Sequence, residues 1–272
     1  MAGLIDKITR DILEFLFSYK IDFDIILNSM KKIHFKVVKL RKQVVNIVIA
    51  VMLVLVGGVA LIAGGNFVPV TAVSGVYYNG DKSNKNISLM VNVYWGTEYL
   101  DSMLETFQDK NVKTTFFVGG TWAINNEENL KKILKKGHEL GNHGYHHKDH
   151  DKISEEENLN QIKNTHKIVK ELTDVDMNLF APPSGAYNKT TVSCATSLGY
   201  QTIMWTRDTI DWRDKDANVI YNRAVKNASG GDLILMHPTE ATVKALPRII
   251  DTLQSQGFNL TTVSENIGSI ES

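Results

Sequence analysis

The alternation that decides the fold begins with ISLMVNVY, residues 87–94, an apolar run of the length of one β-strand. From there to the C-terminus, short apolar runs alternate with longer amphipathic stretches. This alternation is typical of repeated βα units around a mainly parallel sheet. We predict seven strands, at residues 87–94, 114–118, 138–141, 178–181, 201–205, 232–236 and 258–263. The predicted helices between them include residues 100–108, 128–136, 154–172 and 242–254.

The composition favours one catalytic-size domain with an appendage. The chain has 272 residues, of which 43% are apolar, and its 30 basic and 30 acidic residues balance. A neutral chain has no global attraction to nucleic acid, so we expect no nucleic-acid partner. Cys194 is the single cysteine, which excludes an intramolecular disulfide and a thiolate metal cage. Any metal must therefore be held by His, Asp, Glu or Asn.

A membrane segment precedes this domain. The run IVIAVMLVLVGGVALIA, residues 47–63, has no charged residue, and residues 44–46 extend it to the length of about 20 residues that spans a bilayer. We predict a transmembrane helix at residues 44–63. Basic residues crowd the preceding stretch and are absent after it until Lys82, which places residues 1–43 in the cytoplasm and the rest outside. A cleaved signal peptide, with Ala60 and Ala63 as the cleavage motif, is the alternative, but the preceding region is too long for one.

The segments that flank the membrane helix carry weaker signals. Residues 1–43 have apolar positions near helical spacing, which predicts one or two amphipathic helices. These helices either lie on the inner leaflet or contact a partner, or they form a tail without a dedicated function. Residues 64–85 mix Gly, Asn, Ser and Pro with aliphatics and are predicted to be a linker, so the extracytoplasmic domain comprises residues 86–272.

Histidines form the strongest local signal. Five of the eight lie in GHELGNHGYHHKDH, residues 137–150. His143 and His147 are four residues apart, so on a turn of helix after the third strand both imidazoles face one point, as a divalent metal such as zinc requires. Solvated loop histidines are the alternative interpretation.

Three further motifs follow later strands, where the chemistry of parallel sheets collects. In FAPPSGAYN, residues 180–188, prolines and a glycine fix an irregular loop that is able to present N–H groups to a ligand. In DTIDW, residues 208–212, Asp211 is available to orient a histidine and Trp212 offers an apolar wall. In LILMHP, residues 233–238, His237 follows a buried strand and is a candidate general acid. An ordinary turn and a structural histidine are the competing interpretations.

Taken in this order, these motifs resemble those of the polysaccharide deacetylase family, the NodB homology or carbohydrate esterase family 4 domain, over about residues 84–268. KTTFFVGG, residues 113–120, resembles the family's second strand. His143-Gly-Tyr-His-His147 is similar to its H-x-x-x-H zinc motif, and PPSGAYN, residues 182–188, to its substrate-groove motif. DTIDW is similar to D-x-x-D-W, and Leu235-Met-His237 to the closing L-x-H.

The resemblance implies an α/β fold, a deformed (β/α)7 barrel that here follows one transmembrane helix. It also implies zinc, held by two histidines and an aspartate, which polarises an N-acetyl carbonyl, while a second aspartate takes a proton from water. By the same likeness His237 protonates the leaving amine and Asp211 orients it. Trp212 and Leu235 enclose the acetyl methyl. The substrate groove includes Pro183, Gly185 and Tyr187, and the implied substrates are N-acetylated glycans such as peptidoglycan or chitin-like polymers.

The chain departs from the family at the end of the first strand, where two aspartates are expected. It has Met90-Val-Asn-Val-Tyr-Trp-Gly96, so the positions fall on Tyr94 and Trp95, or on Asn92 and Tyr94 in the D-x-D register. The arginine that braces the base aspartate is replaced by Ala181. Asn92 and Glu98 are the alternatives for a third metal ligand, and an uncharged ligand implies weaker affinity or a metal other than zinc.

Two hypotheses about function follow. The first is a membrane-anchored N-deacetylase of bacterial envelope glycans, and it rests on the retained His143, His147, Asp211 and His237. The second is a glycan-binding pseudoenzyme in envelope or spore assembly, and it rests on the missing carboxylates and arginine. Loss of a general base lowers a rate by about 10²- to 10⁴-fold, which leaves both open. We favour the enzyme, because a pure binder has little need for a histidine with its orienting aspartate.

Overall fold

A parallel sheet organises the chain in the computed structural model, which describes residues 75–268. Within that range the strands follow the order β1-β6-β5-β4-β3-β2-β8-β7, every pair is parallel, and β9 pairs with β2 off this path. The strands are β1 (Val76–Tyr77), β2 (Asn86–Val93), β3 (Thr115–Val118), β4 (Glu139–Asn142), β5 (Leu179–Phe180), β6 (Gln201–Ile203), β7 (Arg207–Asp208), β8 (Leu233–Met236) and β9 (Asn259–Leu260).

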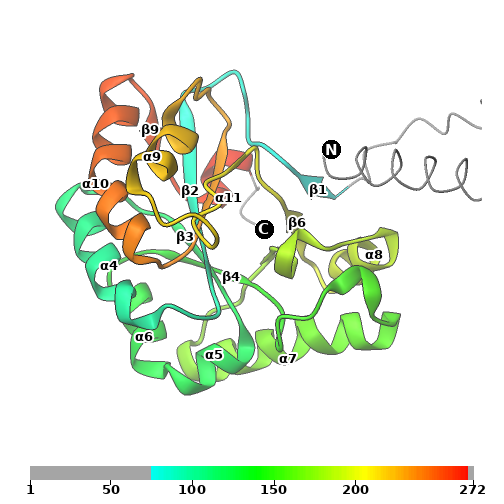
Figure 1. The fold of residues 1–272 in the computed structure, drawn as a ribbon. Coiled ribbons are helices and arrows are strands. Elements are labelled where there is room, and N and C mark those ends of the chain that lie inside the picture. The colour runs from blue at the N-terminus through cyan, green and yellow to red at the C-terminus, as the bar shows by residue number, and fades with distance from the viewer. Residues whose placement is uncertain (1–74, 269–272) are drawn as a thin grey trace, which may run out of the picture. The chain divides into compact units, whose positions relative to one another are not determined.

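Helices follow the outer side of the curved sheet (Figure 1). The α-helices are α4 (Leu100–Asp109), α5 (Gly120–Asn125), α6 (Glu127–Lys135), α7 (Glu155–Thr173), α8 (Lys189–Ser197), α9 (Ala217–Val225), α10 (Glu240–Ser255) and α11 (Val263–Ile267). Three short 3₁₀ helices, η1 (Thr97–Tyr99), η2 (His150–Lys152) and η3 (Pro183–Gly185), lie in the loops.

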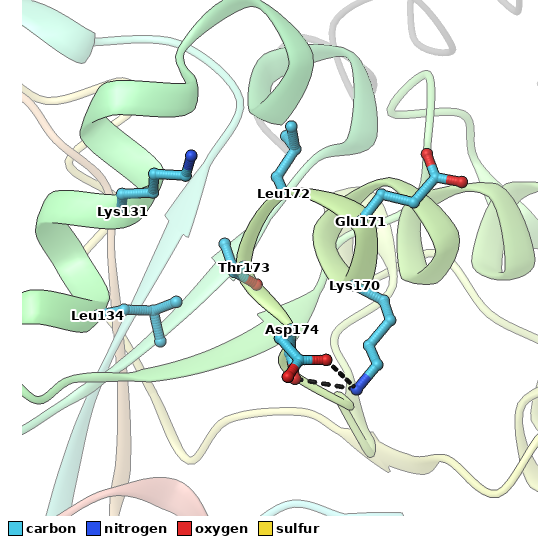
Figure 2. A pocket seen from close by; sticks show the side chains of 7 residues that line it. All are labelled: Lys131, Leu134, Lys170, Glu171, Leu172, Thr173 and Asp174. Carbon is cyan, nitrogen blue, oxygen red and sulfur yellow. Dashed lines mark hydrogen bonds and ion pairs between the residues drawn. The ribbon is translucent and has the colours of Figure 1, made fainter.

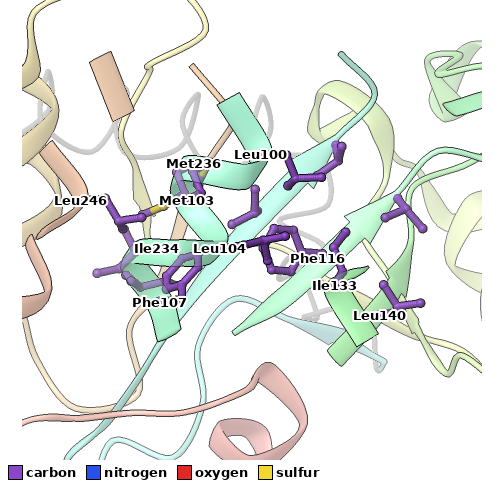
Figure 3. Close-up of a cluster of buried hydrophobic side chains, with 14 of the residues drawn as sticks. Leu100, Met103, Leu104, Phe107, Phe116, Ile133, Leu140, Ile234, Met236 and Leu246 are labelled. Atoms are coloured by element: carbon purple, nitrogen blue, oxygen red, sulfur yellow. The ribbon is translucent and has the colours of Figure 1, made fainter. Parts of the chain in front are cut away.

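The sheet is buried on both faces, which explains its continuous apolar strands. On β2, Leu89 and Val91 belong to the large cluster between sheet and helices, whereas Met90 belongs to a smaller cluster with Phe117 and Leu235. Figure 3 shows side chains of α4, β3 and β8 meeting in the large cluster. The second, smaller cluster fills the inside of the curve, as in a curled half-barrel.

The predicted fold class is confirmed at the level of a parallel, curled half-barrel α/β fold. All seven predicted strands are present, and the four predicted helices begin and end within two residues of their expected bounds. The strand path ends at β1 and β7, with no pairing between them in the described residues, so the curve stays open.

The main differences are short strands. β1 lies inside the segment predicted to be a linker and pairs with β6, and β7 follows a bend after β6 and pairs with β8. Unlike the predicted strands, β1 and β7 do not lie in longer apolar runs, so only the sheet's tertiary pairing identifies them. Among residues 75–268 there is no helix long and apolar enough to cross a membrane. The predicted transmembrane helix at 44–63 and the segment 1–43 lie outside the described residues.

Candidate active site

A cleft of about 420 Å³ lies where the strands end at their carboxyl side. It gathers side chains from motifs up to 145 residues apart, since Asn92 lies on β2 and His237 follows β8. Its lining residues are Asn92, Trp95, His143, His147, Ser184, Trp205, Asp208, Trp212, Leu235 and His237. The fold therefore brings the two candidate metal-ligating histidines and the candidate acid to one place.

His143 and His147 lie in a loop, so the expectation of a helical turn is wrong. The backbone N–H of Gly144 donates to Asn142 Oδ1 at 2.9 Å, and those of Tyr145 and His146 donate to the side chain of Gln161. These side-chain acceptors replace helical hydrogen bonds, and His147 has a left-handed φ of 52°. The two imidazole centroids still lie 5.1 Å apart.

Both imidazoles are prepared to act as neutral ligands. The buried His143 donates Nδ1–H to the carbonyl of Ala181 at 2.8 Å, which leaves its Nε2 with a lone pair. Burial, and then the neighbouring His147, lower the pKa of His143 well below its ordinary value. Burial also lowers the pKa of His147. A metal binds only the unprotonated imidazole, so these shifts favour ligation.

Asp211 fixes the orientation of His237. His237 donates Nδ1–H to Asp211 Oδ1 at 2.7 Å and its backbone N–H to Oδ2 at 2.6 Å. Thr242 Oγ1 donates to the same Oδ2 at 2.5 Å. Asp211 is buried, so these three donors satisfy its carboxylate, and the bond at Nδ1 leaves Nε2 of His237 for the cleft.

Aromatic rings occupy the end of β2 where the family's two aspartates are expected. The ring of Tyr94 lies 5.0 Å from that of His147, and the ring of Trp95 is stacked on His237 at 5.6 Å. Gly96 fixes this placement, because its φ is 75° and a Cβ there would lie 2.0 Å from the carbonyl oxygen of Pro238. The close approach of Gly96 to Pro238 holds the indole of Trp95 beside the imidazole of His237.

Asn92 supplies the remaining polar atom on β2. Its side chain is buried, and Oδ1 has no hydrogen-bond partner. A buried oxygen without a donor is costly, so Oδ1 is an acceptor available to a hydrogen-bond donor or a cation. No group of three or more His, Cys, Asp or Glu within residues 75–268 is arranged to hold a metal. Nevertheless, His143, His147 and Asn92 line one cleft. Two imidazoles and an amide oxygen are ligands that would bind a divalent cation weakly.

The proline loop contributes less to the cleft than expected. Pro183 is buried beside Gly144, and the ring of Trp205 packs so closely on Gly185 that a Cβ would lie 2.7 Å from it. The hydroxyl of Tyr187 bonds that of Tyr78 at the surface. Of this motif only Ser184, whose φ is 57°, lines the cleft.

Glu98 lies on the far side of Trp95. It lines a second hollow of about 270 Å³, together with Trp95 and Trp212, and is absent from the lining of the histidine cleft. Trp212 and Leu235 do line the cleft, as the resemblance implies. Sequence reasoning missed Trp95, Trp205, Ser184 and Asp208 as lining residues. A tryptophan two residues after the end of a buried strand was the available signal for the first two.

A third hollow lies between α6 and the C-terminal end of α7, and none of the motif residues lines it (Figure 2). Its charged groups are already paired, because Lys170 bonds both Asp174 and Asp176 at 2.8 Å and Lys131 bonds Glu127 at 2.5 Å. It offers no free charge or nucleophile to a ligand, so the histidine cleft is the candidate site.

Comparison with known proteins places these motifs in a family. A family profile described as polysaccharide deacetylase matches residues 79–203. The chain is 38% identical over 188 residues to the uncharacterized protein YlxY of Bacillus subtilis (strain 168), covering 69% of this chain and 59% of that one. It is 34% identical over 173 residues to a peptidoglycan-N-acetylglucosamine deacetylase of Bacillus cereus, covering 61% of this chain and 81% of that one.

A similar solved structure is that of a carbohydrate esterase family 4 pseudoenzyme from Bacillus anthracis. It has a TM-score of 0.69 and 35% sequence identity, covering 71% of this chain and 68% of that one. A mutant of that pseudoenzyme with restored enzymatic activity matches equally well, with a TM-score of 0.69 and 34% identity. A protein named as a deacetylase and a protein described as a pseudoenzyme are therefore both similar to this chain.

Proposed function

This chain belongs to the polysaccharide deacetylase family, and from that membership we propose that its cleft binds an N-acetylated glycan of the bacterial cell envelope, as a member that has lost the catalytic base. The glycan class is that in the names of its relatives, which act on peptidoglycan N-acetylglucosamine. The proposal departs from our preference for an enzyme on sequence alone, and the side chains at the end of β2 are the reason.

One observation carries the proposal. In the register anchored on Gly96, Tyr94 and Trp95 fill the two aspartate positions with aromatic rings, and each ring packs against a histidine of the cleft. Among the residues that line the histidine cleft, Asp208 has the one carboxylate, and its Oδ1 accepts the backbone N–H of Ile210 at 2.7 Å. This carboxylate comes from β7 and is held by its own loop, so the end of β2 offers no carboxylate as a base beside His143 and His147.

The other half of the family's machinery is retained. His143, His147 and Asn92 would hold a divalent cation, which when bound would polarise the acetamido carbonyl and lower the pKa of water. Asp211 keeps Nδ1 of His237 protonated, so that Nε2 faces the cleft and is able to carry a proton to a leaving amine. Trp212 and Leu235 supply apolar surface for the acetyl methyl group.

The retained dyad supports a second candidate function, a slow metal-dependent N-deacetylase. A binder has no use for an oriented histidine, and Asp211 holds His237 with two bonds rather than one. Without a base aspartate the rate is expected to fall by about 10²- to 10⁴-fold relative to a complete site.

The location is part of the proposal. The predicted helix at residues 44–63 anchors the chain in the cell membrane once, with residues 1–43 in the cytoplasm and the deacetylase-like domain outside. This arrangement brings the cleft to the compartment where peptidoglycan is found. Fusion of a periplasmic or extracellular reporter to the C-terminus tests the orientation.

The test of function measures binding and turnover separately. N-acetylglucosamine oligomers are added to the full-length chain with zinc or cobalt, and bound oligomer and released acetate are followed. We expect binding with little or no acetate release. Acetate release that disappears in His237→Ala favours the slow enzyme, and failure to bind any N-acetylated oligomer contradicts both candidates.

A further inference from the structure

Tryptophans concentrate around the cleft to an unusual degree. The chain has four, and Trp95, Trp205 and Trp212 line the histidine cleft. The fourth, Trp122, is buried and donates its indole N–H to Thr97 Oγ1 at 2.8 Å. Trp95 is 43% exposed and Trp212 is 56% exposed, although exposed indoles are costly in water. Their exposure at one place indicates a surface that a ligand covers.

Trp95 and Trp212 also separate two hollows. Both residues line the histidine cleft of about 420 Å³ and the second hollow of about 270 Å³. The second hollow lies between η1 and the start of α10, and it includes Gly96 and Thr239. We call Trp95 and Trp212 the indole wall. A ligand longer than one hollow has to pass this wall.

Each indole of the wall has a fixed neighbour on one side. His237 lies parallel to Trp95, with the planes 7° apart. The guanidinium carbon of Arg213 lies 5.8 Å from the ring centre of Trp212. These contacts restrain the rings before a ligand arrives, which reduces the entropy lost on binding.

The charges around the second hollow favour a neutral ligand. Its exposed rim has two acidic and two basic side chains, Glu98, Glu240, Lys215 and Lys244. Glu240 and Lys244 bond each other at 2.5 Å. A balanced rim gives little attraction to a polyanion, but it offers donors and acceptors to hydroxyl and amide groups.

A sugar ring matches this combination of surfaces. One face of a pyranose carries C–H groups, which are attracted to the negative face of an aromatic ring, while its edges carry hydroxyls that need polar partners. We propose that the indole wall binds neighbouring sugar units of an N-acetylated glycan, one unit in each hollow, by stacking on the ring surfaces that His237 and Arg213 leave uncovered and without a metal. This inference rests on the proposed function, because the glycan class is taken from it.

The inference gives Trp95 a role that differs from that of a metal ligand. In the register anchored on Gly96, Trp95 stands where the family has an aspartate, so the same position changes from holding a cation to holding a sugar face. Binding then depends on the indole wall rather than on His143 and His147.

The test is a titration of the full-length chain with N-acetylglucosamine and its dimer to pentamer, in EDTA, followed by tryptophan fluorescence and calorimetry. We expect affinity to rise about tenfold or more between the monosaccharide and the oligomers, since only these reach both hollows. We expect zinc in place of EDTA to change the Kd by less than about twofold.

Variants identify the residues responsible. Trp95→Ala should weaken oligomer binding about tenfold or more, whereas Trp95→Phe, which keeps a ring face, should retain most of it. Ile124→Ala is the matched control, because Ile124 is equally exposed but lines neither hollow. If Trp95→Ala fails to fold, Trp212→Ala, at the more exposed ring of the wall, replaces it and should weaken oligomer binding to a similar degree.

Several outcomes overturn the inference. Equal affinity for the monosaccharide and the oligomers contradicts a ligand that spans the wall. Binding that EDTA or His143→Ala abolishes, with Trp95→Ala unaffected, shows that a metal holds the glycan, and it leaves the proposed function intact. Absence of binding to every oligomer contradicts the inference and the proposed function together.

Discussion

Trp95 lies flat against His237, with ring centroids 5.6 Å apart and planes within 7° of parallel. The indole comes from the end of β2, and the imidazole follows β8, the strand that pairs directly with β2. In the family the end of the first strand supplies carboxylates. Here the end of β2 supplies an indole that rests on the candidate acid, and no carboxylate.

Restoring the carboxylates should restore metal binding and turnover. The triple variant Tyr94→Asp/Trp95→Asp/Ala181→Arg introduces two carboxylates on the side of His143 and His147. Its arginine is included so that the new buried carboxylate has a partner of opposite charge. We expect zinc affinity to rise by more than about tenfold and acetate release to increase by about 10²-fold or more. Calorimetry with zinc and an acetate assay measure these effects.

The control for this variant adds His237→Ala, which should remove the acetate release but not the zinc binding. The restored activity of the Bacillus anthracis pseudoenzyme mutant shows that a similar site is able to regain function. Loss of the Tyr94 hydroxyl bond to Thr121 should lower the melting temperature, so folding is checked first. Tight zinc binding without any turnover would mean that more than the carboxylates has been lost.

Asp211→Asn should disturb the orientation of His237. The carboxylate accepts three hydrogen bonds, whereas an amide has one oxygen and directs N–H groups at the remaining donors. We expect a loss of about 1 to 3 kcal/mol in the free energy of unfolding, from chemical denaturation, because a buried donor is left unpaired. Nitrogen NMR shifts of His237 should report a change of tautomer.

Asp216→Asn is the matched control for that substitution. Asp216 caps α9 by accepting from the N–H of Asn218 at 2.7 Å, and asparagine caps a helix about as well as aspartate. Its stability should change little. A similar small change in Asp211→Asn would show that the three bonds to Asp211 contribute little to the fold.

The fold was predictable because its main elements repeat a sequence pattern. The arrangement of the site at the end of β2 was not predictable. Continuous apolar strands such as β2 and β3 and amphipathic helices such as α10 carry their own periodicity. The loop at His143–His147 does not, since its shape depends on the distant side chain of Gln161. Likewise the stacking of Trp95 on His237 depends on the pairing of β2 with β8, which no local pattern encodes.

Asn92→Asp should convert the unpartnered amide oxygen into a stronger metal ligand. Without metal, a buried carboxylate beside neutral imidazoles is desolvated, so we expect a lower melting temperature than in the wild type. With zinc, the added charge should raise the affinity by about tenfold or more, and ligand binding to the folded state raises stability. Thermal unfolding with EDTA and with zinc measures both effects, and Asn158→Asp, a buried change outside the cleft, should gain nothing from zinc.

Mild acid should destabilise the domain through His138. Burial, with smaller contributions from Lys113 and Lys136, lowers the pKa of His138 from 6.5 to about 4. The unfolded chain therefore binds a proton between these values while the folded chain does not, so stability falls as the pH drops from about 6.5 to about 4. At 1.36 kcal/mol for each pKa unit, the loss is on the order of 3 kcal/mol.

The acid effect is measured as the difference between urea unfolding at neutral pH and near pH 4. His138 Nδ1 accepts the backbone N–H of Thr114 at 3.3 Å, and its ring packs edge-on against Phe107 and Phe116. His138→Asn keeps an acceptor near Nδ1 but does not titrate, so its stability should depend less on pH even though the smaller side chain lowers stability overall. A residual slope is expected, because burial also lowers the pKa of His143 and His150. An unchanged slope in His138→Asn would assign the acid sensitivity to those histidines instead.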